Sequence, residues 1–370
     1  MSKNIVICCD GTGGEYGDCN TNVVNLYHAL VQDEGQVCYY HPGLGTMGSA
    51  TSRNWIEATW SILLGLGFGA GLLGYAGDAY RFLMNCYEDG DHIYLFGFSR
   101  GAYTVRAVSA MLQMFGLLRA GNEGLIPYVL KMFARRSRKA AGMQQHFAEA
   151  AGFKGCFSRA VEIQCVGVWD TVSSVGMIWD PLKLPYTARN PAMKNGRHAV
   201  SIDERRCFFR NNLWGTVYPG QTIKQVWFAG THSDVGGSYT PLECGLPQIT
   251  LEWMLCEAVP LGLRVDPDRV AKILGRSGAK PPVEPDPKQK VHESLKWYWW
   301  PLEFIPRHVY NFTTGKRQWV IPFGRRRQIP AGSTVHETVK LKLAEDSSYK
   351  APNLPTGWEG CVTPWERWGG

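Results

Sequence analysis

Residues 97–101, Gly-Phe-Ser-Arg-Gly, place a serine between two glycines directly after an apolar run. That run, His92–Phe96, has the length of a buried strand, and the residues after the motif repeat apolar side chains at helical spacing. In a turn from strand to helix, Gly97 and Gly101 remove the Cβ atoms that would collide with the strand and the helix. We therefore expect Ser99 to be a nucleophile for acyl transfer. The alternative is an ordinary turn in which Ser99 caps the helix.

A serine hydroxyl needs a histidine base, and the base needs a carboxylate that holds it in place. In sheets of this kind the three groups follow in the order Ser, acid, His. Asp234 lies in a Gly-rich loop directly after the apolar run Gln225–Ala229, so we choose it as the acid. Asp170 is the rival acid, since it also ends an apolar run, although an Asp there commonly caps the following turn.

Three histidines follow Asp234 in the chain, and the base should be among them. His336 comes after the last expected strand and is our choice, with His292 second and His308 third. His232 is only two residues from Asp234, so we interpret it as a residue that orders the loop.

Backbone N–H groups should bind the oxyanion that forms during acyl transfer. The expected donors are Arg100, which follows the nucleophile, and Gly11 or Thr12, in the compact turn after the first apolar run. The alternatives for this turn are a phosphate-binding loop or a plain turn. It lacks the glycine spacing of either common nucleotide-binding motif.

The elements that must position these residues alternate along the chain. Strands are expected at Asn4–Cys9, Gln36–Tyr40, His92–Phe96, Glu162–Val168, Gln225–Ala229 and Gln318–Pro322. Helices are expected at Asn22–Val31, Asp78–Tyr87 and Ala102–Leu118. This alternation predicts an α/β fold of the α/β-hydrolase type, with a mostly parallel central sheet, helices on both faces and lid or cap insertions.

The 370 residues are expected to form a single α/β-hydrolase domain, with insertions near 50–76 and 265–310. The uncharged stretch Trp60–Ala76 is read as a Gly-rich packing segment or an apolar lid, in preference to a membrane span. Trp297–Trp300 either binds a lipid interface or packs inside its insertion.

Composition limits the class of protein. Apolar residues make up 45% and charged residues 19%, which is ordinary globular usage, and the eleven cysteines form no metal-binding pattern. The net charge of +7 is concentrated at Lys131–Lys139 and Arg325–Arg327, which are either solvated surface or weakly attracted to anionic lipid. We expect no cofactor, no metal and no nucleic-acid partner.

The chain begins with Met1-Ser-Lys-Asn and continues directly into an apolar run, which leaves no room for a secretory signal peptide. We therefore expect synthesis in the cytoplasm. Any export would use a system that reads no N-terminal signal.

The sequence resembles the α/β-hydrolase catalytic domain of type VI secretion phospholipase effectors, formerly a domain of unknown function. The matching segments are Cys9–Thr12, Thr21–Val23, Tyr40–Thr46, Gly97–Tyr103, Gly167–Val172, Ser201–Arg206, His232–Gly237 and Val335–His336. The resemblance implies ester hydrolysis on a lipid, with a triad of Ser99, Asp234 and His336. It also implies that Asp10 and Asp170 organise loops or support the triad.

These observations favour a lipase or phospholipase that works through an acyl-enzyme. The alternatives are a soluble carboxylesterase or thioesterase for small acyl substrates, and a catalytically silent scaffold that retains the fold. The partners expected with the leading interpretation are the lipid or acyl-ester substrate, a membrane surface contacted peripherally, and a secretion apparatus or an immunity protein.

Overall fold

The computed structural model describes residues 2–11, 17–43, 68–135, 140–172, 176–177, 180–181, 184–278, 282–312 and 314–361. Its centre is a sheet of eight parallel strands in the order β14-β13-β10-β9-β6-β3-β1-β2. The strands are β1 (Asn4–Cys9), β2 (Gln36–His41), β3 (His92–Phe98), β6 (Ile163–Trp169), β9 (Met193–Ser201), β10 (Thr222–Phe228), β13 (Thr334–His336) and β14 (Glu359–Cys361).

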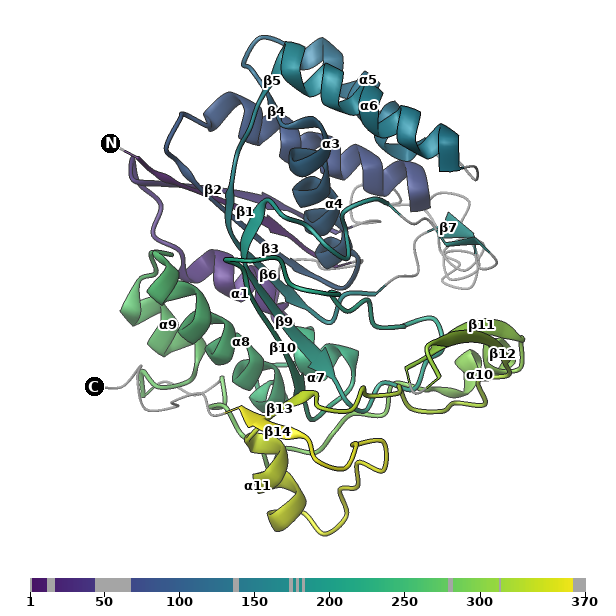
Figure 1. The fold of residues 1–370 in the computed structure, drawn as a ribbon. Coiled ribbons are helices and arrows are strands. Elements are labelled where there is room, and N and C mark those ends of the chain that lie inside the picture. The colour runs from purple at the N-terminus through teal and green to yellow at the C-terminus, as the bar shows by residue number, and fades with distance from the viewer. Residues whose placement is uncertain are drawn as a thin grey trace, which may run out of the picture.

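Helices cover both faces of this sheet (Figure 1). On one face lie α3 (Phe68–Cys86), α4 (Ser99–Phe115), α5 (Ile126–Ala134) and α6 (Ala140–Phe157). On the other lie α1 (Asn22–Ala29), α8 (Gly245–Ala258) and α9 (Pro267–Ile273), with α11 (Thr338–Glu345) at the β13 edge. This is the mostly parallel, doubly covered sheet of the α/β-hydrolase fold, as the sequence predicted.

The remaining elements are short. They are α7 (His232–Gly236), α10 (Trp300–Glu303), the 3₁₀ turns η1 (Glu123–Leu125), η2 (Val259–Leu261) and η3 (Trp297–Trp299), and the antiparallel pairs β4 (Leu117–Leu118) with β5 (Ser158–Arg159), β7 (Gly176–Met177) with β8 (Asp180–Pro181), and β11 (Arg307–Asn311) with β12 (Lys316–Val320). Among the described residues, no helix is long and apolar enough to cross a bilayer.

The alternation of side chains along the strands divides the core between the two faces. In β1, Ile5 and Ile7 pack with α3 and α4, whereas Val6 and Cys8 pack with α1 and α8. All six residues of β1 are buried. A strand buried on both faces reads as a continuous apolar run, which is why the sequence located β1 correctly.

The structure differs from the expected strands in two respects. The run expected at Gln318–Pro322 overlaps β12, which pairs only with β11 in a separate hairpin. Strand β9 was missed because it carries charged and polar residues that are nevertheless buried. Its Arg197 satisfies its charge through Glu257, with 2.6 Å between Nε and Oε2. The stretch Trp60–Ala76 falls partly outside the described residues, and its described part belongs to α3.

The turn from β3 into α4 is held by close backbone packing. A Cβ atom on Gly101 would collide with the carbonyl oxygens of Cys9 and Asp10 at the end of β1. Gly97 faces the same constraint, because its Cβ would lie 2.6 Å from the backbone of Gly101. Glycine is therefore required at both positions for β1, β3 and α4 to approach one another.

We predict that Gly101→Ala lowers the free energy of unfolding by about 3 kcal/mol, because backbone atoms must move to accept the methyl group. Gly155→Ala is the matched control. Gly155 lies in α6 with open space around it, so this substitution should stabilise the protein by about 0.5–1 kcal/mol. Urea unfolding followed by circular dichroism measures both. Equal stability of the two variants would contradict the packing described for this turn.

Candidate active site

Ser99 occupies the tight turn between β3 and α4. Its φ of 57° lies in the left-handed region, which is strained for a residue with a side chain. The parallel sheet places this turn at the carboxyl ends of the strands, where ligand sites of open α/β sheets are found. The conformation is that of a nucleophile elbow.

The residue that faces Ser99 is His232, the first residue of α7. Its Nε2 lies 2.8 Å from Ser99 Oγ, and its Nδ1 lies 2.5 Å from Asp170 Oδ2. With Asp170 ionised, Nδ1 carries the proton and Nε2 is left to accept the Ser99 hydroxyl proton. Ser99, His232 and Asp170 thus form one continuous hydrogen-bonded chain.

The sheet order explains why Asp170 reaches this site. Asp170 directly follows β6, which is the neighbour of β3 in the sheet. His232 is the first residue of α7, which follows β10, and β10 lies two strands beyond β6 in the sheet. The His232 ring packs on the ring of Phe98. A Cβ atom on Gly236 would collide with the Phe98 ring, so the glycine lets α7 lie that close.

Asp170 is fully buried, and a guanidinium group compensates its charge. Arg327 forms two hydrogen bonds to it, 2.5 Å from Nη1 to Oδ1 and 2.9 Å from Nη2 to Oδ2. The backbone N–H of Ser201 donates a further bond to Oδ1 at 3.0 Å. Burial alone would raise the pKa of Asp170, but Arg327 and His232 outweigh it and hold this pKa well below its usual range.

The His232 ring is packed between two aromatic side chains. Phe98 lies 4.6 Å and Phe209 lies 4.8 Å from it, centroid to centroid. Burial lowers the pKa of His232, more strongly than the contact with Asp170 raises it. A neutral imidazole at neutral pH is the form that can accept a proton.

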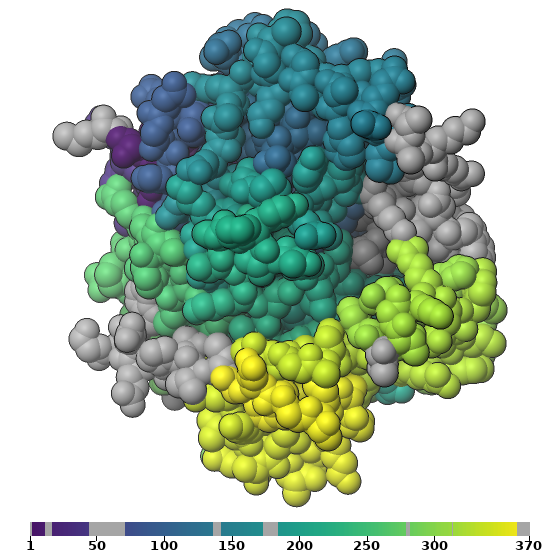
Figure 2. Space-filling model, viewed as in Figure 1, coloured from purple at the N-terminus to yellow at the C-terminus, as the bar shows by residue number. Residues whose placement is uncertain are grey.

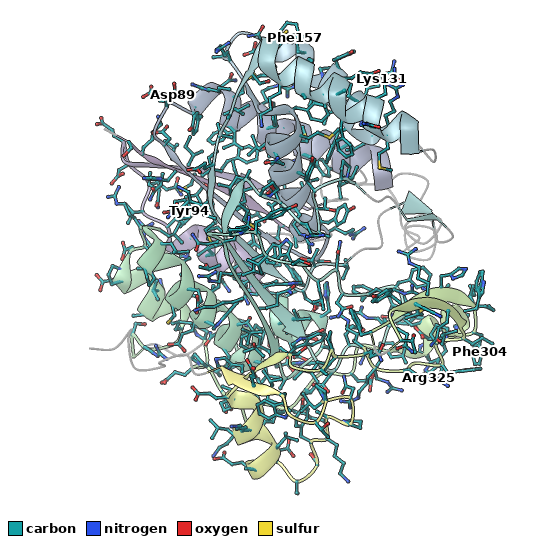
Figure 3. All side chains as sticks on the ribbon, viewed as in Figure 1. Asp89, Tyr94, Lys131, Phe157, Phe304 and Arg325 are labelled. Carbon is teal, nitrogen blue, oxygen red and sulfur yellow. The ribbon has the colours of Figure 1, made fainter. Side chains whose placement is uncertain are left out.

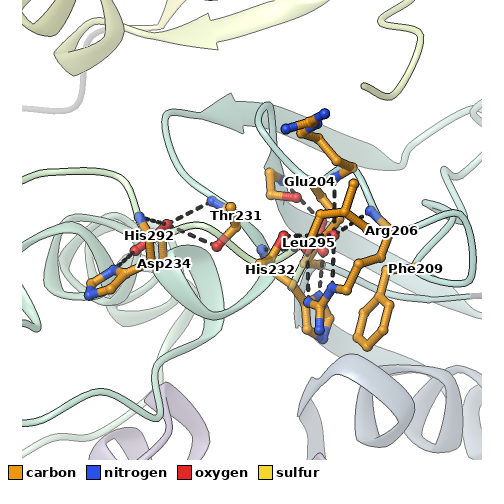
Figure 4. A network of polar contacts seen from close by, with 12 residues as sticks. Glu204, Arg206, Phe209, Thr231, His232, Asp234, His292 and Leu295 are labelled. Atoms are coloured by element: carbon orange, nitrogen blue, oxygen red, sulfur yellow. Dashed lines mark hydrogen bonds and ion pairs between the residues drawn. The ribbon is translucent and has the colours of Figure 1, made fainter. Parts of the chain in front are cut away.

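A second ion pair supports the backbone beneath His232 (Figure 4). The buried Glu204 accepts hydrogen bonds from Arg206 Nε at 3.0 Å and Nη2 at 2.9 Å, and from the His232 backbone N–H at 3.2 Å. Burial opposes ionisation of Glu204, but Arg206 lowers the pKa of its carboxyl to about 2. The Arg206 guanidinium also lies over the Phe209 ring, 3.6 Å from its centroid.

Asp234, the acid expected from the sequence, has another role. Its carboxylate accepts hydrogen bonds from the Thr231 backbone N–H at 2.8 Å and from the Thr231 hydroxyl at 3.0 Å, which makes it part of the capping box that starts α7. Its other oxygen lies 2.6 Å from Nδ1 of His292. His292 therefore pairs with Asp234, and its ring stacks on Tyr239 with centroids 3.6 Å apart.

His336, the base expected from the sequence, lies at the end of β13. Four strand spacings separate β13 from β3, which is about 19 Å. Its Nδ1 lies 2.9 Å from Thr338 Oγ1, its ring stacks on Phe228, and burial lowers its pKa to about 3. The expected grouping of Ser99 with Asp234 and His336 is therefore wrong, because His232 and Asp170 occupy the positions beside Ser99.

The third choice of base, His308, belongs to the separate hairpin, where its ring lies against Trp319.

The turn after β1 lies against Ser99. A Cβ on Gly11 would be 3.2 Å from Ser99 Cβ. The Gly11 N–H, one of the expected oxyanion donors, donates instead to Asp10 Oδ1 at 2.6 Å. Asp10 also accepts from Thr21 and Tyr40, and its burial raises its pKa. Thr12 lies outside the described residues, and Arg100 belongs to the first turn of α4.

A small hollow lies beside the elbow. Its lining includes Asp10, His41, Tyr75, Arg100 and Thr104. Among the described residues, no three His, Cys, Asp or Glu side chains are grouped to hold a metal ion.

Sequence reasoning missed Arg327 and Glu204 as parts of the site. Arg327 was assigned to a surface basic cluster, yet its side chain is only 7% exposed because it lies along Asp170. Its neighbour Arg326 pairs with Asp203. The motif Ser201–Arg206, which was noticed only as part of a resemblance, supplies the contacts to both ion pairs.

We predict that Arg206→Gln raises the pKa of His232, because it removes a cation and leaves the Glu204 carboxylate beside the ring. Arg205→Gln is the matched control, since the Arg205 side chain bonds to Gly324 O and Glu293 instead. Histidine ring titration by NMR measures the shift. An unchanged His232 pKa in Arg206→Gln would contradict the electrostatic description.

Comparison with known proteins places this site in a family. The family described as T6SS phospholipase effector Tle1-like, catalytic domain, matches residues 3–257. An uncharacterized protein of Saccharomyces cerevisiae is 36% identical over 220 residues, which are 56% of this chain and 32% of the yeast protein. This chain therefore spans about a third of that relative.

Two solved structures are similar at lower identity. One is an uncharacterized protein from Pseudomonas aeruginosa, with 21% identity over 74% of this chain and 48% of that one, and a TM-score of 0.45. The other is the Tle1 effector bound to the VgrG spike from the Type 6 secretion system, with 17% identity over 66% of this chain and 53% of that one, and a TM-score of 0.36. The family match covers more than two thirds of the sequence, including Ser99, Asp170 and His232. The chain belongs to the Tle1-like phospholipase effector catalytic domain family.

Proposed function

We propose that this protein hydrolyses acyl esters of lipids, with Ser99 as nucleophile, His232 as general base and Asp170 as the carboxylate that orients the base. The observation that carries the proposal is the single His232 ring with one nitrogen 2.8 Å from Ser99 Oγ and the other 2.5 Å from Asp170. Family membership supports a lipase or phospholipase role.

In the first half of the reaction, Ser99 Oγ attacks the acyl carbon while its proton moves to His232 Nε2. The imidazolium that forms is stabilised by the ionised Asp170, which keeps its negative charge through Arg327. His232 then gives the proton to the leaving alcohol, and the acyl group stays on Ser99. In the second half, water attacks the acyl carbon while its proton moves to His232. The bond between the acyl carbon and Ser99 Oγ then breaks, the fatty acid leaves, and His232 returns the proton to Ser99 Oγ.

The oxyanion that forms in both halves needs backbone donors. Arg100 directly follows Ser99 in the first turn of α4, the position from which a backbone N–H can reach an oxyanion on the attacked acyl group. We assign Arg100 to this role. Gly11 could join it only after its N–H leaves Asp10.

Type VI effectors leave the cell without an N-terminal signal, so the proposal extends to export by such a system and to contact with a secretion apparatus. This extension rests on the family match alone. Soluble ester or thioester hydrolysis would be favoured in its place if short, monomeric acyl substrates were cleaved faster than phospholipid.

We predict that His232→Ala and Asp170→Asn each lower kcat by about 10³-fold or more on a phospholipid and on a short p-nitrophenyl ester, because the first removes the base and the second its orientation. Ser99→Ala should abolish turnover on both substrates. His336→Ala is the matched control for His232→Ala and should retain most activity, because its ring lies against Phe228 and Thr338. Loss of activity in His336→Ala with activity kept in His232→Ala would overturn the assignment.

The pH dependence follows from the lowered pKa of His232. Only neutral His232 accepts the Ser99 proton, so activity is present above the pKa of His232 and is lost as the pH falls through it. Because burial places this pKa below 6.5, the acid limb of kcat/KM for a soluble ester should lie below pH 6.5. An acid limb with its midpoint above that value would contradict the assignment.

A further inference from the structure

A lobe rich in basic and aromatic residues lies beside the Ser99 site. It comprises residues 296–327, which fold into η3, α10 and the β11–β12 hairpin. The segment has seven Lys or Arg and one acidic residue, Glu303. Arg307 is buried, and Arg326 and Arg327 pair with carboxylates of the body, so the cations that face solvent are Lys296, Lys316, Arg317 and Arg325. It also contains nine of the chain's aromatic residues, counting Phe, Trp and Tyr. In Figure 2 the lobe is the lime-coloured protrusion at the edge of the molecule.

The aromatic side chains of this lobe face solvent. Of the sixteen large apolar side chains that are exposed among the described residues, nine lie between Trp297 and Phe323. Trp297 is 79% exposed, so packing inside an insertion, one of the two alternatives for Trp297–Trp300, is wrong for this residue. Figure 3 places Phe304 and Arg325 at the outer part of the lobe.

The β11–β12 hairpin places four of these side chains, Tyr310, Phe312, Trp319 and Ile321, on one face. The register pairs His308 with Trp319 and Tyr310 with Arg317. Because side chains alternate across a strand, these four residues share a face, and Phe312 and Ile321 extend it by the same alternation. We call these six residues the hairpin face. Trp319 is 64% exposed and Tyr310 is 48% exposed.

The opposite face of the hairpin is attached to the body of the protein. Arg307 is buried there, where its Nη1 donates to Cys207 O at 3.2 Å and its guanidinium lies over the Phe208 ring. The single carboxylate of the lobe, Glu303, is also buried and accepts from the Cys207 and Gly324 N–H groups. The outward surface therefore combines aromatic rings with cations and no carboxylate.

The lobe also touches the wall of the active site. Trp299 packs edge to face on Phe209 at 5.7 Å, and Phe209 packs on the ring of His232. The residues that anchor the lobe, such as Cys207, follow β9, so the lobe is attached at the carboxyl ends of the strands, on the side of Ser99.

We propose that the hairpin face docks this protein on the surface of an anionic lipid bilayer. Trp and Tyr side chains favour the interface between headgroups and acyl chains, and each Lys or Arg near an anionic surface adds attraction. Docking by this lobe brings the side of the sheet that carries Ser99 toward the lipid. The inference rests on the proposed lipid hydrolysis for its purpose, but docking itself requires no turnover.

The test measures vesicle binding in the Ser99→Ala background, so that its result is independent of hydrolysis. Sedimentation with phosphatidylserine/phosphatidylcholine vesicles is compared with sedimentation with pure phosphatidylcholine vesicles. We expect binding to the anionic vesicles that weakens with added salt. Trp319→Ala should weaken it about ten-fold through lost interfacial burial, and Arg317→Gln about five-fold through lost charge.

Matched controls come from the far end of the molecule, where Figure 3 places Phe157 and Lys131. Phe157 is 43% exposed and Lys131 belongs to the other basic cluster. Phe157→Ala and Lys131→Gln should bind anionic vesicles like the parent protein. The proposal is overturned if the parent does not bind anionic vesicles, or if the hairpin and control variants lose affinity equally. If the parent protein does not bind anionic vesicles, a protein partner would become the occupant proposed for the hairpin face. Failure of the proposed function would appear separately, as absence of ester hydrolysis by the wild-type protein.

Discussion

The buried negative charge of Asp170 is the constraint on which the site depends. An isolated carboxylate in a protein interior would be neutralised or would unfold its surroundings, so it must be paired and fully hydrogen-bonded. Here its partners come from separated parts of the chain: Ser201 at the end of β9, His232 after β10, and Arg327 at the end of the hairpin lobe. Pairing this one charge therefore fixes the positions of these three segments relative to Ser99.

The same constraint explains the arrangement around the histidine. His232 must remain neutral while it lies between a carboxylate and a buried ion pair. Burial between Phe98 and Phe209 lowers the pKa of His232 and so favours its neutral form. Glu204 raises this pKa and Arg206 lowers it, so the two charges oppose each other. The lobe that carries Trp299 packs on Phe209, so the surroundings of the base continue into the exposed aromatic surface.

Much of the fold could be predicted because its signals are local. The apolar run Asn4–Cys9 and the elbow at Ser99 are each contained within a few residues, and the structure has β1 at those bounds and a positive φ at that serine. Strand β9 could not be found in this way, because Arg197 acquires its partner Glu257 from a distant helix.

The partners of Ser99 depend on which strands are neighbours, and that information is not local. The order Ser, acid, His holds for Ser99, Asp170 and His232, but choosing them required knowing that β6 lies next to β3. Closeness in sequence to Asp234 argued against His232, whereas its actual carboxylate is 62 residues away. The role of Arg327 could not be predicted for a related reason. A run of three arginines is typical of an exposed basic surface, and its carboxylate partners, Asp203 and Asp170, are distant in the sequence.

The central claim is that Ser99 is a nucleophile activated by His232 and Asp170. The most direct measurement is the rate of covalent labelling by a fluorophosphonate, with the modified residue located by mass spectrometry of peptides. We predict a single adduct on Ser99 that forms rapidly in the wild-type protein and about 10³-fold more slowly in His232→Ala. An adduct on another residue, or equal labelling rates in the two proteins, would contradict this account.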